Sequence, residues 1–207
     1  MTKIIQQPLT VFLFLSLLAL LSCSEPATNE PSAPPPPPEP VTARFAFQRM
    51  YIQARTWAPD VQPLRISNMN LNEVPSEAGK CAAWRATFVS NRLKRSRTYT
   101  FSVVESPGNA YEGVLPGPEQ SWSGPTGQAL PFPPQMLKVD SDEAYSTAVK
   151  RSSAFVKENP DKPVHFLLEF TPRFPNLTWR VIWGDTLGSS DHSIFVDSST
   201  GKYLQTL

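Results

Sequence analysis

The stretch "LTWRVIWG" (177–184) alternates its side chains around two tryptophans. Trp179 and Trp183 fall on one side of this run and Arg180 on the other, which is the period of a β-strand with one buried face. A related stretch, "AAWRATFV" (82–89), shares the Trp-Arg pair and lies 95 positions earlier. The repetition predicts two copies of one structural unit.

Segments on either side of the two Trp-Arg runs also match. "YTFSVVESPGNAY" (99–111) aligns with "HSIFVDSSTGKY" (192–203), since both are alternating runs followed by a turn that contains glycine. Upstream, "WAPDVQPLRI" (57–66) and "ENPDKPVHFL" (158–167) share a Pro-Asp step and a second proline before a strand-like run. The features follow in the same order in both halves, and only the loop lengths differ.

Each half opens with an amphipathic helix, because apolar residues recur there with a period of 3.6. Thr42 is the expected N-cap of the first helix, which should end before Pro59. Asp140 and Glu143 have the spacing of a capping box at the start of the second helix, which should end before Pro160. Alternating runs after each helix predict a helix packed on an antiparallel meander.

The order of helix and strands, together with "FVDSSTGKYL" (195–204), resembles the PepSY domain. In that family a strand ends in Val-Asp, a Thr-Gly turn follows, and a short last strand closes the sheet. The resemblance covers 137–207 directly and 41–115 through the internal repeat. It implies an α+β fold of two tandem PepSY- or cystatin-like repeats, each one helix on a small antiparallel sheet. The second repeat would span 138–207, after a Pro/Gly-rich linker at 116–137.

The N-terminus indicates export. After the single cation Lys3, "VFLFLSLLALL" (11–21) is long enough for a signal-peptide core and too short to span a bilayer. It leads into "LLSC" (20–23), which resembles the lipobox of bacterial lipoproteins. The resemblance implies a signal peptide at 1–22 and diacylation of Cys23 as the mature N-terminus. The alternative is an ordinary cleaved signal peptide followed by a cysteine.

The segment from Ser24 to Pro40 contains eight prolines and no aromatic or branched aliphatic residue. Such a chain adopts extended polyproline II, which rises ~3.1 Å per residue and would reach up to ~50 Å. We therefore expect a lipidated Pro-rich tether at 23–40 that anchors the protein in the bacterial cell envelope. Serine after the lipidated cysteine resembles outer-membrane sorting, which would place the protein on the periplasmic face in a diderm.

Asp197 is the acidic residue that most resembles an active-site group, because it ends a strand-like run. It also opens a turn in which Gly201 supplies the positive φ that a hairpin needs. The first repeat keeps the glycine and lacks the aspartate. We therefore interpret Asp197 and Gly201 as a structural turn.

A basic loop follows the first Trp-Arg run and contains Arg92, Lys94, Arg95 and Arg97. It could contact lipid headgroups, lipopolysaccharide phosphates or an acidic protein. The alternative is a solvated loop that blunts the edge of a sheet. Trp122, in the linker, either fills a crevice between the repeats or marks a binding surface.

Composition argues against several other functions. The chain has 19 basic and 18 acidic residues, so no global field favours nucleic acid. Two histidines in the whole chain argue against a metal site, and no cofactor motif is present. Cys81 lies on a strand pattern, which predicts a small, buried hydrophobic side chain. "GSSDHS" (188–193) contains Ser, Asp and His but no nucleophile elbow.

The function that we expect is non-enzymatic: binding of a protein or peptide, or modulation of a protease, at the membrane to which the lipid anchors the chain. PepSY domains are associated with protease propeptides and inhibition, and an extended peptide could add to a sheet edge. A structural or assembly lipoprotein that scaffolds an envelope complex is the first alternative. The second is a hydrolase whose site is assembled from scattered residues, with Asp191 and His192 as candidates.

Overall fold

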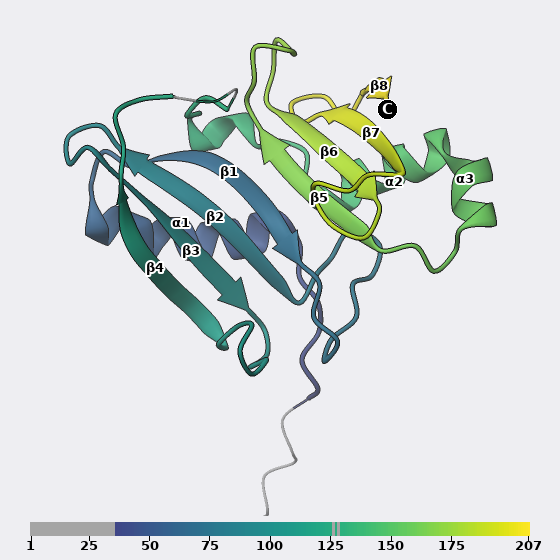
Figure 1. Cartoon of the computed structure of the whole chain (residues 1–207), viewed down its shortest axis with the longest axis horizontal. Coiled ribbons are helices and arrows are strands. Elements are labelled where there is room, and N and C mark those ends of the chain that lie inside the picture. The colour runs from purple at the N-terminus through teal and green to yellow at the C-terminus, as the bar shows by residue number, and fades with distance from the viewer. Residues whose placement is uncertain (1–35, 126, 128) are drawn as a thin grey trace, which may run out of the picture. The chain divides into compact units, whose positions relative to one another are not determined.

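The computed structural model describes residues 36–125, 127 and 129–207, of which 37–207 form one unit (Figure 1). The predicted signal peptide, the lipidation site Cys23 and the tether up to residue 35 lie outside the described residues. The elements follow in the order α1 (Ala43–Trp57), β1 (Gln62–Met69), β2 (Ala83–Ser90), β3 (Arg95–Ser102), β4 (Gly113–Ser121), the 3-10 helix η1 (Pro134–Met136), α2 (Ser141–Arg151), α3 (Ser153–Glu158), β5 (Val164–Glu169), β6 (Thr178–Trp183), β7 (His192–Asp197) and β8 (Tyr203–Thr206).

All eight strands belong to one antiparallel sheet, in the order β4-β3-β2-β1-β5-β6-β7-β8. The prediction of two tandem repeats, each with its own small sheet, is therefore wrong. β1 and β5 each begin a meander and would each leave an unpaired edge in a separate unit. They pair with each other instead, in the register Arg65 with Glu169, Ile66 with Leu168 and Ser67 with Leu167.

The seam between the two meanders, defined here as the β1–β5 pairing, continues through the side chain of Asn68. This buried amide accepts the Phe166 N–H at 2.7 Å through its Oδ1. Its Nδ2 donates to Asn70 Oδ1 at 2.7 Å and lies 3.4 Å from the Val164 carbonyl oxygen. A side chain thus satisfies backbone groups beyond the point where the two strands cease to pair.

The helices lie on one face of the sheet (Figure 1). α1 contacts β1–β4, and α2 contacts β6–β8. The Thr42 side chain caps α1, and the capping box of Asp140 and Glu143 at the start of α2 is present, as predicted. The second helix was predicted as one element, but it breaks at Ser152 into α2 and α3.

One hydrophobic core spans both halves and contains Trp84, Phe166 and Trp179 without exposed surface above 1%. The ring of Trp84 lies 5.9 Å from that of Phe166, so the core crosses the seam. The halves therefore share their main core, and a smaller cluster around Leu71 and Ala82 lies in the first half alone.

The starts of α1 and α2 also meet. The Asp140 carboxylate accepts the Arg44 N–H at 2.9 Å, and the Ser141 hydroxyl accepts the Ala43 N–H at 3.0 Å. These bonds satisfy backbone donors in the first turn of α1 with side chains from α2. Gly79, at φ +86°, packs on the same place, where a Cβ would lie 2.5 Å from Asp142 Cα.

The segment expected as linker is partly ordered into the sheet. Residues 116–121 belong to β4, the outermost strand beside β3, and include Pro116 and Pro118. Farther on, Phe132 is fully buried and its N–H donates to the Pro63 carbonyl at 2.9 Å. The linker therefore contributes both an edge strand and a core residue. Among the helices of the described chain, none has the length and apolar content that crossing a membrane requires.

Candidate functional site

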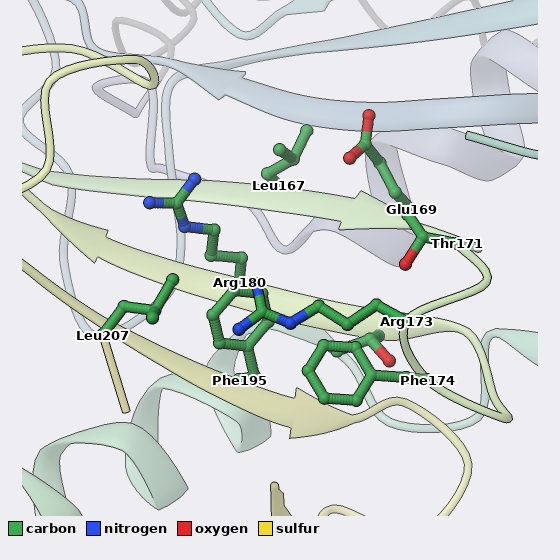
Figure 2. A pocket seen from close by; sticks show the side chains of 9 residues that line it. Leu167, Glu169, Thr171, Arg173, Phe174, Arg180, Phe195 and Leu207 are labelled. Atoms are coloured by element: carbon green, nitrogen blue, oxygen red, sulfur yellow. The ribbon is translucent and has the colours of Figure 1, made fainter. Parts of the chain in front are cut away.

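A pocket opens on the face of the sheet opposite the helices, over β5–β7 (Figure 2). Its volume is about 140 Å³. Its strand residues alternate with the core residues of the same strands, which places them on the open face. We call it the arginine pocket; it is lined by Leu167, Glu169, Thr171, Arg173, Phe174, Thr178, Arg180, Phe195 and Leu207.

Arg173 reaches from the β5–β6 loop across the ring of Phe195 (Figure 2). Its guanidinium carbon lies 4.8 Å from the centroid of Phe195 and 5.3 Å from that of Phe174. One of its nitrogens, Nη2, donates to Gln205 Oε1 at 2.8 Å. Stacking and this bond hold the planar group over the pocket while other N–H donors remain available.

Arg180 stands on β6 beside the same ring, with its guanidinium carbon 5.7 Å from the Phe195 centroid. Its Nε donates to Ser193 Oγ at 3.1 Å, which leaves its two Nη groups available. Burial lowers the pKa of Arg180 below its ordinary value, the charge of Arg173 acts in the same direction, and Glu169 opposes both. Two like charges therefore lie beside one buried ring.

Neither arginine has an ion-pair partner among the described residues. The one acid in the lining, Glu169, is instead paired with Arg65 across the seam at 2.5 Å. Guanidinium groups held without a carboxylate are ready to bind an anionic group, because they present planar forks of N–H donors. The arginine pocket is therefore our candidate site for a ligand among the described residues.

The basic loop that the sequence singled out is largely held by the fold. Arg95 Nη1 donates to Ser121 Oγ at 3.1 Å, and Arg97 Nε donates to the Gly117 carbonyl at 2.8 Å, so both attach β3 to β4. Arg92 lies 3.9 Å from a carboxylate oxygen of Asp60. Lys94 occupies a turn position at φ +52°.

Trp122 covers that same turn and does not lie between the halves. Its backbone N–H donates to the Lys94 carbonyl at 3.0 Å, and its indole N–H donates to Asn91 Oδ1 at 3.1 Å.

Asp197 organises the β7–β8 turn. Its Oδ1 accepts the backbone N–H groups of Ser199 at 2.7 Å and Thr200 at 3.0 Å, and its Oδ2 accepts from Asn176 at 2.8 Å. Burial acts to raise its pKa, but these bonds outweigh burial, and the pKa lies below its usual value. Gly201, at φ +71°, closes the turn.

The side chains of the two residues named for a hydrolase contact different partners. Asp191 pairs with Lys162 at 2.5 Å, whereas His192 Nε2 lies 2.7 Å from Ser152 Oγ. A serine beside a histidine has the spacing of a nucleophile and its base. Ser152 is buried, however, at the break between α2 and α3, and His192 stacks on Phe155 at 4.6 Å. The pair fastens the helix break to β7.

Cys81 is fully buried, and burial raises the pKa of its thiol to about 11. A thiol in this state is a poor nucleophile at neutral pH. Among the described residues, no three His, Cys, Asp or Glu side chains gather in a group that would hold a metal ion.

The sequence did not single out Arg173 or Phe195 for the site. The available signal was Phe195 itself, a large aromatic at a position that alternates with the core residues Ile194 and Val196. An aromatic on the open face of a sheet marks either a covered surface or a binding surface.

No family model matches the chain, and no curated protein matches it. Among solved structures, the chain is similar to a candidate lipoprotein from Clostridium difficile 630, with 11% sequence identity and a TM-score of 0.45. The similarity covers 78% of this chain and 91% of that one.

Proposed function

We propose that this chain is a non-catalytic, lipid-anchored protein of the bacterial cell envelope, and that it binds a protein or peptide partner through the open face of its sheet. The observation that carries the proposal is the arginine pocket, in which Arg173 and Arg180 have no ion-pair partner among the described residues. The anchor rests on the lipobox-like "LLSC" that ends at Cys23. Attachment to the outer membrane and modulation of a protease are finer parts of the same proposal.

The two sheet edges favour the face over strand addition as the binding surface. β4 carries Pro116 and Pro118, which lack the N–H that an added strand would use. β8 has four residues and a register shift opposite Phe195 and Val196. Prolines, short length and bulges are devices by which edge strands avoid pairing with other chains.

The surroundings of the candidate nucleophiles support the proposal that the protein is not catalytic. Ser152 is buried against His192, and Cys81 is buried with a raised pKa. A nucleophile must be accessible to a substrate and ionised or activated by a base.

The test is a pull-down from detergent-solubilised envelope with the full-length protein immobilised, followed by mass spectrometry. Arg173→Gln/Arg180→Gln is compared with Arg85→Gln, because exposed Arg85 follows Trp84 as Arg180 follows Trp179. We expect a partner that the double variant loses and the control keeps. A partner that is retained by the original protein, the double variant and Arg85→Gln would mean that binding takes place outside the pocket. Capture of no partner by any of the three proteins would contradict the proposed function.

A further inference from the structure

Two kinds of side chain line the arginine pocket. Arg173 and Arg180 supply positive charge, and Leu167, Phe174 and Leu207 supply apolar surface. Its volume of about 140 Å³ resembles the ~150 Å³ cavity that admits benzene, so it accommodates an anionic group joined to a small apolar body.

The donors of the lining favour a carboxylate. Glu169 is paired with Arg65, so the two arginines are the charges of the lining that remain uncompensated, and no lysine lines the pocket. The lining is made of side chains on strands and a loop, with no helix start to supply the backbone N–H groups that usually cradle phosphate. A carboxylate matches the planar fork of a guanidinium.

Resting on the proposed function, we propose that the arginine pocket binds the terminal carboxylate of a peptide or protein whose last side chain is apolar. Such a residue carries its carboxylate and its side chain on the same carbon. The carboxylate then faces the free Nη groups of Arg180 and the remaining donors of Arg173, while the side chain lies against Leu167 and Leu207. An aspartate or glutamate within a chain offers the same carboxylate but no adjacent apolar side chain.

The test measures binding of short synthetic peptides to the full-length protein by titration calorimetry. The probe is acetyl-alanyl-alanyl-leucine as the free acid, and its matched control is the same peptide as the amide. A third peptide, amidated and with an internal glutamate, tests the side-chain source of the carboxylate, and inorganic phosphate tests the general anion. We expect the free acid to bind at least about tenfold more tightly than the other three probes, since a charge-assisted bidentate contact is lost in each.

Variants separate recognition of the carboxylate from folding. Arg173→Gln changes an exposed side chain. Arg180→Lys keeps the charge but removes the guanidinium fork. Each variant should bind the free-acid peptide about tenfold more weakly than the original protein does. Arg85→Gln should leave its affinity unchanged. Equal affinity for acid and amide, or for phosphate, would overturn the inference, and so would equal weakening by Arg85→Gln.

Different experimental outcomes would overturn this inference and the proposed function. A partner captured from the envelope that is kept by Arg173→Gln and Arg180→Lys would leave the proposed function standing and remove the carboxylate pocket. If the glutamate peptide binds more tightly than the free acid, the pocket recognises an acidic side chain and not a terminal carboxylate. No bound peptide and no captured partner would overturn both.

Discussion

Trp84 and Trp179 meet edge to face in the core, with ring centroids 6.5 Å apart and planes at 67°. Each indole N–H donates at 2.9 Å to the carbonyl of a valine two residues before a helix: Val41 before α1 for Trp84, and Val139 before α2 for Trp179. The two residues thus do the same work in each half, and they also contact each other across the seam. Their contact places the aromatic centre of the core across the seam.

Replacing either tryptophan by phenylalanine should lower the free energy of unfolding by about 2–4 kcal/mol, because the carbonyl of Val41 or Val139 loses its indole donor and a cavity opens in the core. Urea unfolding, followed by circular dichroism and by the fluorescence of the remaining tryptophans, should give one coincident transition in Trp84→Phe and Trp179→Phe alike. Two transitions in either variant would mean that the halves unfold separately despite the shared core.

Asn68 should be the most sensitive polar residue of the seam. Asn68→Leu leaves the Phe166 N–H without its acceptor in a buried place, which should cost about 1–3 kcal/mol of stability. Asn70→Ala removes an exposed partner of Asn68 but leaves the bond from Phe166 in place, and should cost about 1 kcal/mol or less. Equal effects of the two changes on the urea midpoint would refute a special role for the buried amide.

Asp197 should matter for acid stability and not for ligand binding. Its folded pKa lies below the unfolded value, so its contribution is complete above the unfolded pKa and is lost as pH falls through the folded one. Asp197→Asn should therefore flatten the fall in melting temperature below pH ~4. The same variant should capture the envelope partner as the original protein does; loss of the partner without loss of stability would make Asp197 part of a binding site.

Both histidines should make the protein less stable in mild acid. Burial lowers the pKa of His165 and of His192 below the ordinary 6.5, and unfolding releases both from burial. The unfolded chain then binds more protons, so the free energy of unfolding falls as pH drops through about 6.5 toward the folded pKa values. His165→Gln/His192→Gln should show a flatter dependence of urea midpoint on pH between 7 and 5, and an unchanged slope would assign that dependence to other groups.

The sequence predicts individual elements well where local chemistry decides them. Thr42, the capping box of Asp140 and Glu143, and the alternation around Trp84 and Trp179 lie where such patterns lead one to expect helices and strands. Alternation says which face of a strand is buried, but it does not say which neighbour the strand's edge joins. The pairing of β1 with β5, which makes one sheet of two expected ones, follows from tertiary packing that no local period records.

Other features stayed hidden for different reasons. Pro116 and Pro118 are typical of linkers, yet an edge strand tolerates proline because its outer side needs no partner. The arginine pocket brings together Arg173 from a loop, Arg180 from β6 and Phe195 from β7, whose spacing along the chain resembles no motif. A site assembled by register and loop path appears only once the sheet is formed.

The way the chain enters its sheet has a mechanical consequence. Val41 exchanges backbone bonds of 3.0 and 2.9 Å with Cys81, and its carbonyl also accepts the indole N–H of Trp84. A force applied from the N-terminal side would therefore load these three bonds at Val41 first. They attach the entering chain to the fully buried Cys81 and Trp84, and not to an outer strand of the sheet.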